Sequence, residues 1–108
     1  RPAMILHAVY LSLPEGADPN ALAHVMKGLT ALVGDIDGFT AFHHGPNIDA
    51  EGKSPEAHYG FHGHFTDRAA LDGYAADPRH RALGARLVAL CGGADRIKVY
   101  DIDVADAP

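Results

Sequence analysis

Four short segments rich in apolar side chains predict β-strands: the first is apolar on both alternating sets, and the third alternates most sharply. The predicted strands span residues 4–13, 38–44, 57–65 and 96–103. Three other segments carry apolar residues at helical spacing: a helix from Pro19 to a terminating Gly34, a short helix over residues 67–76 and a longer one over residues 78–91. Asp18-Pro19 and Asp77-Pro78 each supply an N-cap followed by proline in the first helical position.

The resulting order, βαββ(αα)β, is typical of a four-stranded antiparallel sheet with helices on one face, the ferredoxin-like α+β fold. The chain then has no segment left to cover the other face. On that face we expect a patch of apolar and aromatic side chains, made of Leu6, Ala8, Tyr10, Tyr100 and Ile102. Soluble monomers rarely leave such a patch in water, and the same face of a second copy covers it most simply. The sequence therefore predicts a homodimer whose two sheets face each other.

Three polar side chains fall where the pattern predicts an inward, apolar face. His7 shares its strand face with apolar residues, while Tyr74 and His80 lie on apolar stripes of their helices. All three should point into the layer between sheet and helices. Because Gly63 and Gly84 remove side-chain volume from that layer, we expect a hollow there that can hold a small apolar molecule. The residues expected to line it are Val9, Leu11, Phe61, Gly84, Leu87 and Val99.

Several short motifs, in this order, resemble the stress-responsive dimeric α/β barrel (Dabb) family from residue 4 to about residue 104. They are Met-Ile-x-His-x-Val at residues 4–9, Gly45-Pro46-Asn47, Phe65-Thr66, Tyr-x-x-x-Pro-x-His at residues 74–80, and Tyr100-Asp101. The family often has histidine immediately before the proline, where this chain has Asp77. The resemblance implies a single domain over residues 1–108 and a facing-sheet homodimer, the dimeric α/β barrel.

A plant polyketide cyclase of that family resembles this chain at His7, Tyr74, His80 and Gly84. The resemblance implies a general base at His80, an enolate-stabilising Tyr74 and a pocket-lining His7, chemistry that suits a near-neutral imidazole and a phenol. The same residues also fit a structural role, in which His80 bonds the buried Tyr74 hydroxyl and fixes the bend at Pro78. Both interpretations stay open, and with them whether the chain is an enzyme. A hollow beside His7 and His80 would favour a ligand site.

A second group of histidines lies on the other strand face. His58, His62 and His64 alternate along the third predicted strand, and His43 and His44 fall on its expected neighbour. Imidazoles two residues apart project from the same side and could share a metal ion. No cysteine or carboxylate completes a four-ligand set by spacing, so we predict no metal and no cofactor. We expect these histidines inside the dimer, where their protonation near pH 6.5, roughly the imidazole pKa, loosens it.

The composition excludes several classes of protein. The 108 residues, 47% of them apolar, suit one compact domain, and a net charge of -5 opposes binding to nucleic acid. No run approaches the roughly 18 to 20 apolar residues of a membrane span, and no secretory signal is visible. The single cysteine, Cys91, cannot close an internal disulfide, which fits a cytoplasmic location. We expect a cytoplasmic homodimer of unassigned biochemical role that binds a small apolar ligand, or a polyketide cyclase-like enzyme.

Overall fold

The fold is one antiparallel sheet with its helices on one side. The structure, a computed structural model, describes residues 4–104. Strands β1 (Met4–Leu11), β2 (Phe39–Pro46), β3 (Tyr59–Phe65) and β4 (Ile97–Val104) pair in the order β2-β3-β1-β4. The helices are α1 (Pro19–Thr30), α2 (Arg68–Ala76) and α3 (Pro78–Cys91), with a short 3-10 turn, η1 (Ala94–Arg96). The predicted ferredoxin-like α+β fold is confirmed.

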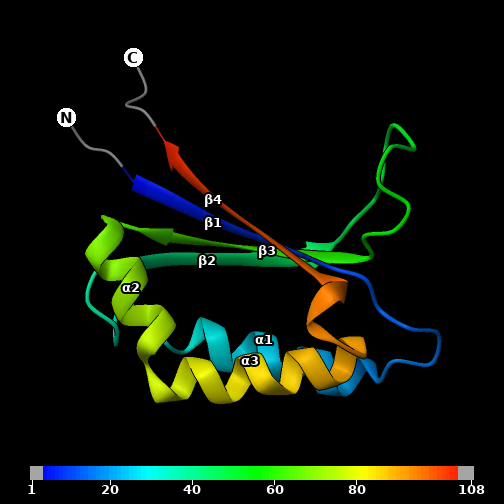
Figure 1. Cartoon of the computed structure of the whole chain (residues 1–108), viewed down its shortest axis with the longest axis horizontal. Helices are drawn as coiled ribbons and strands as arrows, with labels where there is room; N and C mark the ends of the chain where they lie inside the picture. Colours follow the sequence, from blue (N-terminus) through cyan, green and yellow to red (C-terminus); the bar gives the residue numbers. More distant parts are fainter. Residues whose placement is uncertain (1–3, 105–108) are drawn as a thin grey trace.

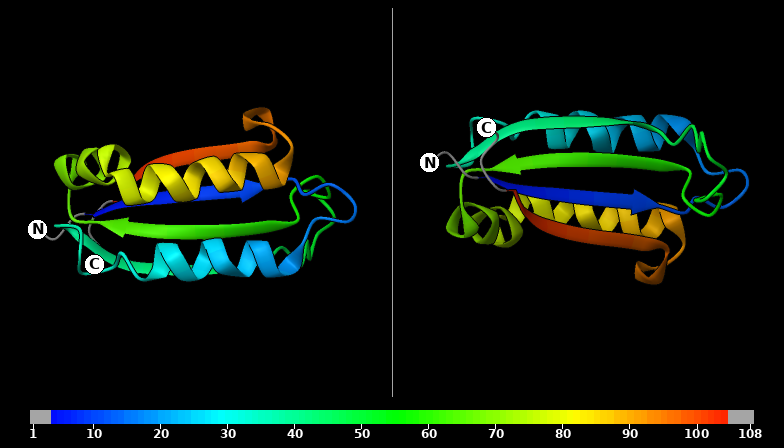
Figure 2. Two further views of the ribbon diagram at one scale, coloured as in Figure 1. Left: turned by 90° about the horizontal axis from the view of Figure 1, so that it is seen from below. Right: turned by 90° about the horizontal axis from the view of Figure 1, so that it is seen from above.

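The helices leave one face of the sheet uncovered. Figure 1 shows α1 and α3 beneath the sheet and α2 at its end. Seen from below in Figure 2, α1 and α3 run side by side along the strands, whereas from above no helix lies over them. Within residues 4–104, no helix is long and apolar enough to cross a bilayer.

The ends of several predicted elements differ from the structure: β2 extends to Pro46, β3 begins at Tyr59, and two further differences have a clear cause. The first strand stops at Leu11, two residues early, and the backbone N–H of Leu13 donates to Nδ1 of His58 at 2.8 Å. Helix α1 ends at Thr30 instead of continuing to Gly34, because the next residues form tight turns that close through i to i+3 hydrogen bonds. One difference comes with a hydrogen bond to a distant residue and the other with local turns, and hydrophobic spacing reveals neither.

The core fills the middle of the layer between sheet and helices. The rings of Phe39 and Phe65 stack with centroids 4.8 Å apart and an interplanar angle of 9°. Tyr74 of α2 packs against both rings at 5.0 and 4.9 Å, while Leu11 and Met26 pack beside them, fully buried. This cluster fixes α2 against the sheet, and with it the position of Tyr74.

The sharp turn from α2 into α3 is fixed by Asp77. Its carboxylate accepts a hydrogen bond from the backbone N–H of Arg79 at 2.8 Å, capping α3, and also accepts from the Arg79 guanidinium. These hydrogen bonds lower the pKa of Asp77 to about 2. Because Pro78 follows as the first helical residue, the chain bends here and brings His80 back against Tyr74.

Gly38 is held where a side chain has no space. Its φ is +77°, and a Cβ there would lie 2.5 Å from both the Cβ of Ala70 and Oγ1 of Thr66. Gly34 has a similar φ of +84° but nothing within 4 Å of an added Cβ. We expect Gly34→Ala to lower the free energy of unfolding, measured by chemical denaturation, by about 1 kcal/mol, because only the positive φ is unfavourable for alanine. Gly38→Ala should lower it by about 2 to 4 kcal/mol, because the new methyl group also clashes with its neighbours. Equal losses of stability in the two variants would contradict this explanation.

Candidate functional site

A cleft of about 680 Å³ opens at the end of the layer between sheet and helices. Strand β1 contributes His7 to it, β4 contributes Asp101, and α2 and α3 contribute Tyr74 and His80. The remaining wall is partly apolar and includes Leu71. The structure therefore brings the three predicted catalytic candidates, His7, Tyr74 and His80, to one cleft.

Tyr74 and His80 face each other without a hydrogen bond. Their ring centroids are 4.0 Å apart and the interplanar angle is 37°. The side chain of Tyr74 is only 2% exposed, and its burial raises the pKa of the phenol. Among residues 4–104 the buried Nδ1 of His80 has no hydrogen-bond partner, and the Tyr74 hydroxyl, which is not fully enclosed, forms no hydrogen bond either. The hydrogen bond on which the purely structural interpretation depends is thus not formed.

The charge state of His80 suits a base. Burial lowers its pKa and outweighs a hydrogen bond with the Ala75 backbone, which raises it, while the neighbouring His7 lowers it further. Because the pKa falls below the ordinary value of 6.5, the imidazole is neutral at pH 7 and holds a free lone pair. His80 would lose this form only when the pH drops below its lowered pKa.

Asp101, noted in the sequence only as part of the Tyr100-Asp101 motif, is a site residue in the structure. Its Oδ1 lies 2.6 Å from Nδ1 of His7. A carboxylate at Nδ1 places the proton of a neutral imidazole there and leaves Nε2 as the acceptor. The His7 ring also meets Tyr74 edge-on, with centroids 5.8 Å apart. The signal was present in the alternation of β4, since pairing β1 with β4 sets Asp101 directly opposite His7.

The rim of the cleft is acidic. Asp72 and Asp103 lie there beside Asp101, and Arg68 is the one basic residue apart from the histidines among the lining residues within 4–104. The Arg68 side chain donates to Oδ1 of Asp72 at 2.9 Å, and this bond raises the pKa of the guanidinium. The polar rim surrounds a more apolar interior, as is usual for a small-molecule site.

The residues expected to line a hollow in the middle of the layer lie elsewhere. Four of them are buried members of the packed core: Val9, Leu11, Phe61 and Leu87. Val99 is 50% exposed at the edge strand, and Gly84 lies on α3 with open space beside it. None of the six lines the cleft that contains His7. The reason is that aromatic rings fill the middle of the layer, so the free volume lies at its end.

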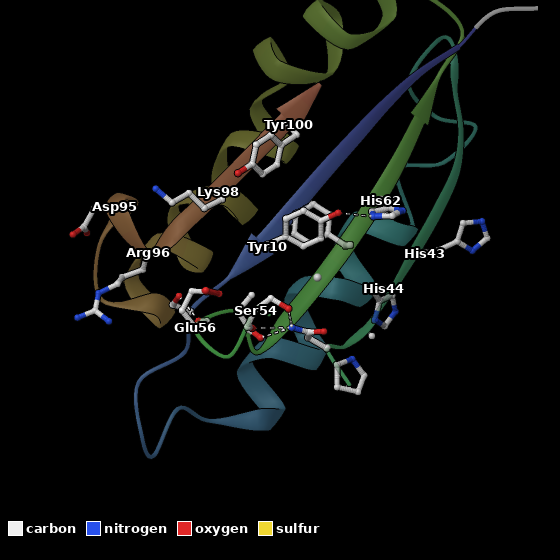
Figure 3. A pocket seen from close by; sticks show the side chains of 17 residues that line it. Tyr10, His43, His44, Ser54, Glu56, His62, Asp95, Arg96, Lys98 and Tyr100 are labelled. Atoms are coloured by element: carbon white, nitrogen blue, oxygen red, sulfur yellow. Dashed lines mark hydrogen bonds between the residues drawn. The ribbon is translucent and has the colours of Figure 1, made fainter. Parts of the chain in front are cut away.

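A second groove, of about 870 Å³, lies on the uncovered face of the sheet. Figure 3 shows Tyr10 and Tyr100 along its floor, with His43 and His62 to one side and Lys98 to the other. The hydroxyl of Tyr10 is 3.3 Å from Nε2 of His62. This is the face that carries the predicted apolar patch.

The predicted histidine face is only partly assembled. His62 and His64 share it with His43, which is the register partner of His62. His58 precedes β3 and accepts a hydrogen bond from Leu13, as described above, whereas Nδ1 of His44 lies 2.6 Å from the Tyr59 hydroxyl on the opposite face. In the described part of the chain, no three histidine, cysteine or acidic side chains converge in a way that could hold a metal ion.

Comparison with known proteins identifies the family. Residues 5–104 match the family described as Stress responsive A/B Barrel Domain, abbreviated Dabb. The chain belongs to the Dabb family. The Dabb relatives include the stress-response A/B barrel domain-containing protein HS1 of Arabidopsis thaliana, which is 26% identical over 97 residues, or 90% of this chain and 86% of the relative. The resemblance seen in the motifs is confirmed.

Solved structures share the Dabb fold over almost their whole length. A dimeric ferredoxin-like protein of unknown function from Jannaschia sp. CCS1 is 43% identical, with a TM-score of 0.89 over 94% of this chain and 99% of that one. The hydroxynitrile lyase from Passiflora edulis is 10% identical, with a TM-score of 0.82 over 99% and 98% of the two chains. At that identity the likeness shows the fold alone.

Proposed function

We propose that this Dabb protein binds a small organic molecule in the cleft between α2 and strands β1 and β4. The proposal is carried by His80, whose Nδ1 is buried in the cleft wall and has no hydrogen-bond partner among the described residues, beside a Tyr74 hydroxyl that makes no hydrogen bond there either. Buried polar groups are normally hydrogen-bonded, because an unmade bond costs roughly 1 to 3 kcal/mol. A ligand with a carbonyl or hydroxyl oxygen would supply the missing acceptor. The partly apolar wall favours a molecule whose remaining surface is apolar.

We test binding with acetophenone, which combines an apolar ring with one carbonyl. In an NMR titration of backbone amides, the shifts should map to residues around Tyr74. Tyr74→Phe removes the donor without changing the ring, and we expect acetophenone to bind about tenfold more weakly, the equivalent of one hydrogen bond. The matched control is Tyr59→Phe, whose hydroxyl contacts His44 outside the cleft and should leave affinity unchanged. Shifts that map elsewhere, or unchanged affinity in Tyr74→Phe, would contradict the proposed site.

A second candidate function, proton transfer on a carbonyl compound, is favoured by the paired imidazoles. His80 is neutral at pH 7, and His7 is oriented by Asp101. In the reaction class implied by the resemblance to a polyketide cyclase, the C–H bond beside the carbonyl breaks and its proton passes to His80. The electron pair moves into an enolate, whose oxygen accepts a hydrogen bond from Tyr74.

The proposal also includes a homodimer formed through the uncovered sheet face. Tyr100 and Ile102 are 52% and 48% exposed there, an unusual state for large apolar side chains in a soluble chain. Leu6 and Tyr10 are half-buried beside them, while Ala8 is already covered by its neighbours and adds little surface. The Jannaschia relative, 43% identical, is described as dimeric, which supports the same assembly for this chain. A two-fold axis needs only this one self-complementary face.

A further inference from the structure

We propose that pH controls this dimer through three histidines on the sheet face, His43, His62 and His64, whose neutral rings allow the two sheets to meet and whose protonation separates them. The inference rests on the proposed homodimer and adds a mechanism of regulation to it. It follows from where the three side chains lie and from which charges face them.

The three imidazoles form one cluster across two strands. His43 of β2 is the register partner of His62 on β3. The rings of His43 and His64 are 5.5 Å apart between centroids, at an angle of 66°. Burial lowers the pKa of His64, and the two neighbouring histidines lower it further. The rings are therefore close enough that charging one of them opposes charging the next.

No carboxylate faces this cluster from the strands of residues 4–104. Strand alternation places Ala41 beside the histidines on β2, Leu6, Ala8 and Tyr10 on β1, and Lys98, Tyr100 and Ile102 on β4. Among the described strand residues, the one formal charge on this face at neutral pH is thus the cation Lys98, and the Tyr10 hydroxyl lies within hydrogen-bonding distance of His62. Asp101 and Asp103 project to the helix side, where they border the cleft.

The acidic residues that line the groove lie at its end, away from the cluster. Figure 3 shows Glu56 and Asp95 beside Arg96, across the floor from His62 and His43. A protonated imidazole would therefore meet an apolar or basic surface on its own subunit. In a two-fold dimer the partner presents the same surface, so its charges double the repulsion.

The sign of the pH effect follows from this arrangement. Covering an unpaired imidazole lowers its pKa below the value in the free monomer, because the charged form loses water and gains no counter-ion. The dimer is thus favoured where the imidazoles are neutral, and it weakens as the pH falls and the free monomer takes up protons that the dimer excludes. Each histidine that becomes protonated in the monomer but stays neutral in the dimer raises the dissociation constant, by up to about tenfold per pH unit.

Sedimentation equilibrium at pH 7.5 and pH 5.5, at matched ionic strength, tests the proposal. For the natural sequence we expect the dissociation constant to rise at least tenfold at pH 5.5, while far-UV circular dichroism stays unchanged. The triple variant His43→Gln, His62→Gln, His64→Gln keeps polar side chains that cannot titrate, and should dimerise equally at both pH values. His24→Gln, on the exposed side of α1, is the matched control and should keep the full pH dependence.

The outcomes separate the two proposals. A chain that is monomeric at pH 7.5 at all concentrations would overturn the proposed homodimer, and the proposed regulation by pH with it. A dimer with one dissociation constant at both pH values would leave the homodimer intact and overturn the pH control. Persistent pH dependence in the triple variant, or unfolding of the natural chain at pH 5.5, would show that other groups are responsible and would also overturn it.

Discussion

Replacing His80 by alanine should reduce the exchange of acetophenone methyl hydrogens for deuterium at least 100-fold, without weakening acetophenone binding. The expected size is that of a removed general base. His80 borders the cleft, its pKa is lowered by burial, and its ring lies 4.0 Å from that of Tyr74. The measurement is proton NMR in D₂O at neutral pH, and the exchange rate in buffer without protein is subtracted. Binding is followed by amide shifts in the same samples.

Two further variants identify the group that takes the proton. His80→Gln fills the space that alanine leaves empty and should lose exchange equally, which excludes a mere packing defect. Exchange that survives in both His80 variants but disappears in Asp101→Asn would instead assign the base to His7, which Asp101 orients at 2.6 Å. If neither histidine affects exchange, the proton-transfer candidate is wrong, whereas the binding site stands on the Tyr74→Phe comparison.

The pH profile gives a test that a structural role for His80 would not pass. Because the pKa of His80 is lowered from 6.5, its neutral form persists into mildly acidic solution. Exchange should therefore stay constant from pH 8 down past 6.5 and fall only below the lowered pKa. An exchange rate that already halves at pH 6.5 would point to an imidazole of ordinary pKa.

The strands, the helices and their faces could be predicted from the sequence because they depend on local spacing. The bend at Asp77-Pro78 is an example: a cap and a proline are adjacent in the chain, and together they fix the direction of α3. The uncovered sheet face could be predicted because the chain has helices enough to cover only one face of the sheet. These predictions use information that lies within a few residues of each position.

The location of the cleft depends on contacts between distant residues, so spacing could not give it. Phe39 and Phe65 stack although 26 positions separate them, and their rings fill the middle of the layer where a hollow was expected. The free volume lies instead at the end of the layer, beside α2. Asp101 joined the site only through the register of β4 against β1, which sets it opposite His7. The chemistry of the three predicted side chains was visible in sequence, while the shape around them was not.

Ile102→Asp should raise the dissociation constant of the dimer about a thousandfold at pH 7.5. Ile102 is 48% exposed on the uncovered face, at the register partner of Leu6, and the proposed interface would bury it. A carboxylate there would lose water without gaining a counter-ion, at a cost of about 2 kcal/mol or more per copy. The two-fold axis applies that cost twice, and about 4 kcal/mol corresponds to the expected change.

Val99 supplies the matched control, because it is on the same strand with nearly the same exposure, 50%, but points to the helix side. Val99→Asp introduces the same carboxylate and the same loss of a branched side chain. Sedimentation equilibrium should therefore find Val99→Asp as dimeric as the natural chain and Ile102→Asp monomeric at micromolar concentration. Equal dissociation of the two variants would mean that the carboxylate acts through the stability of β4, and the sheet face would then no longer be the surface that joins the two copies.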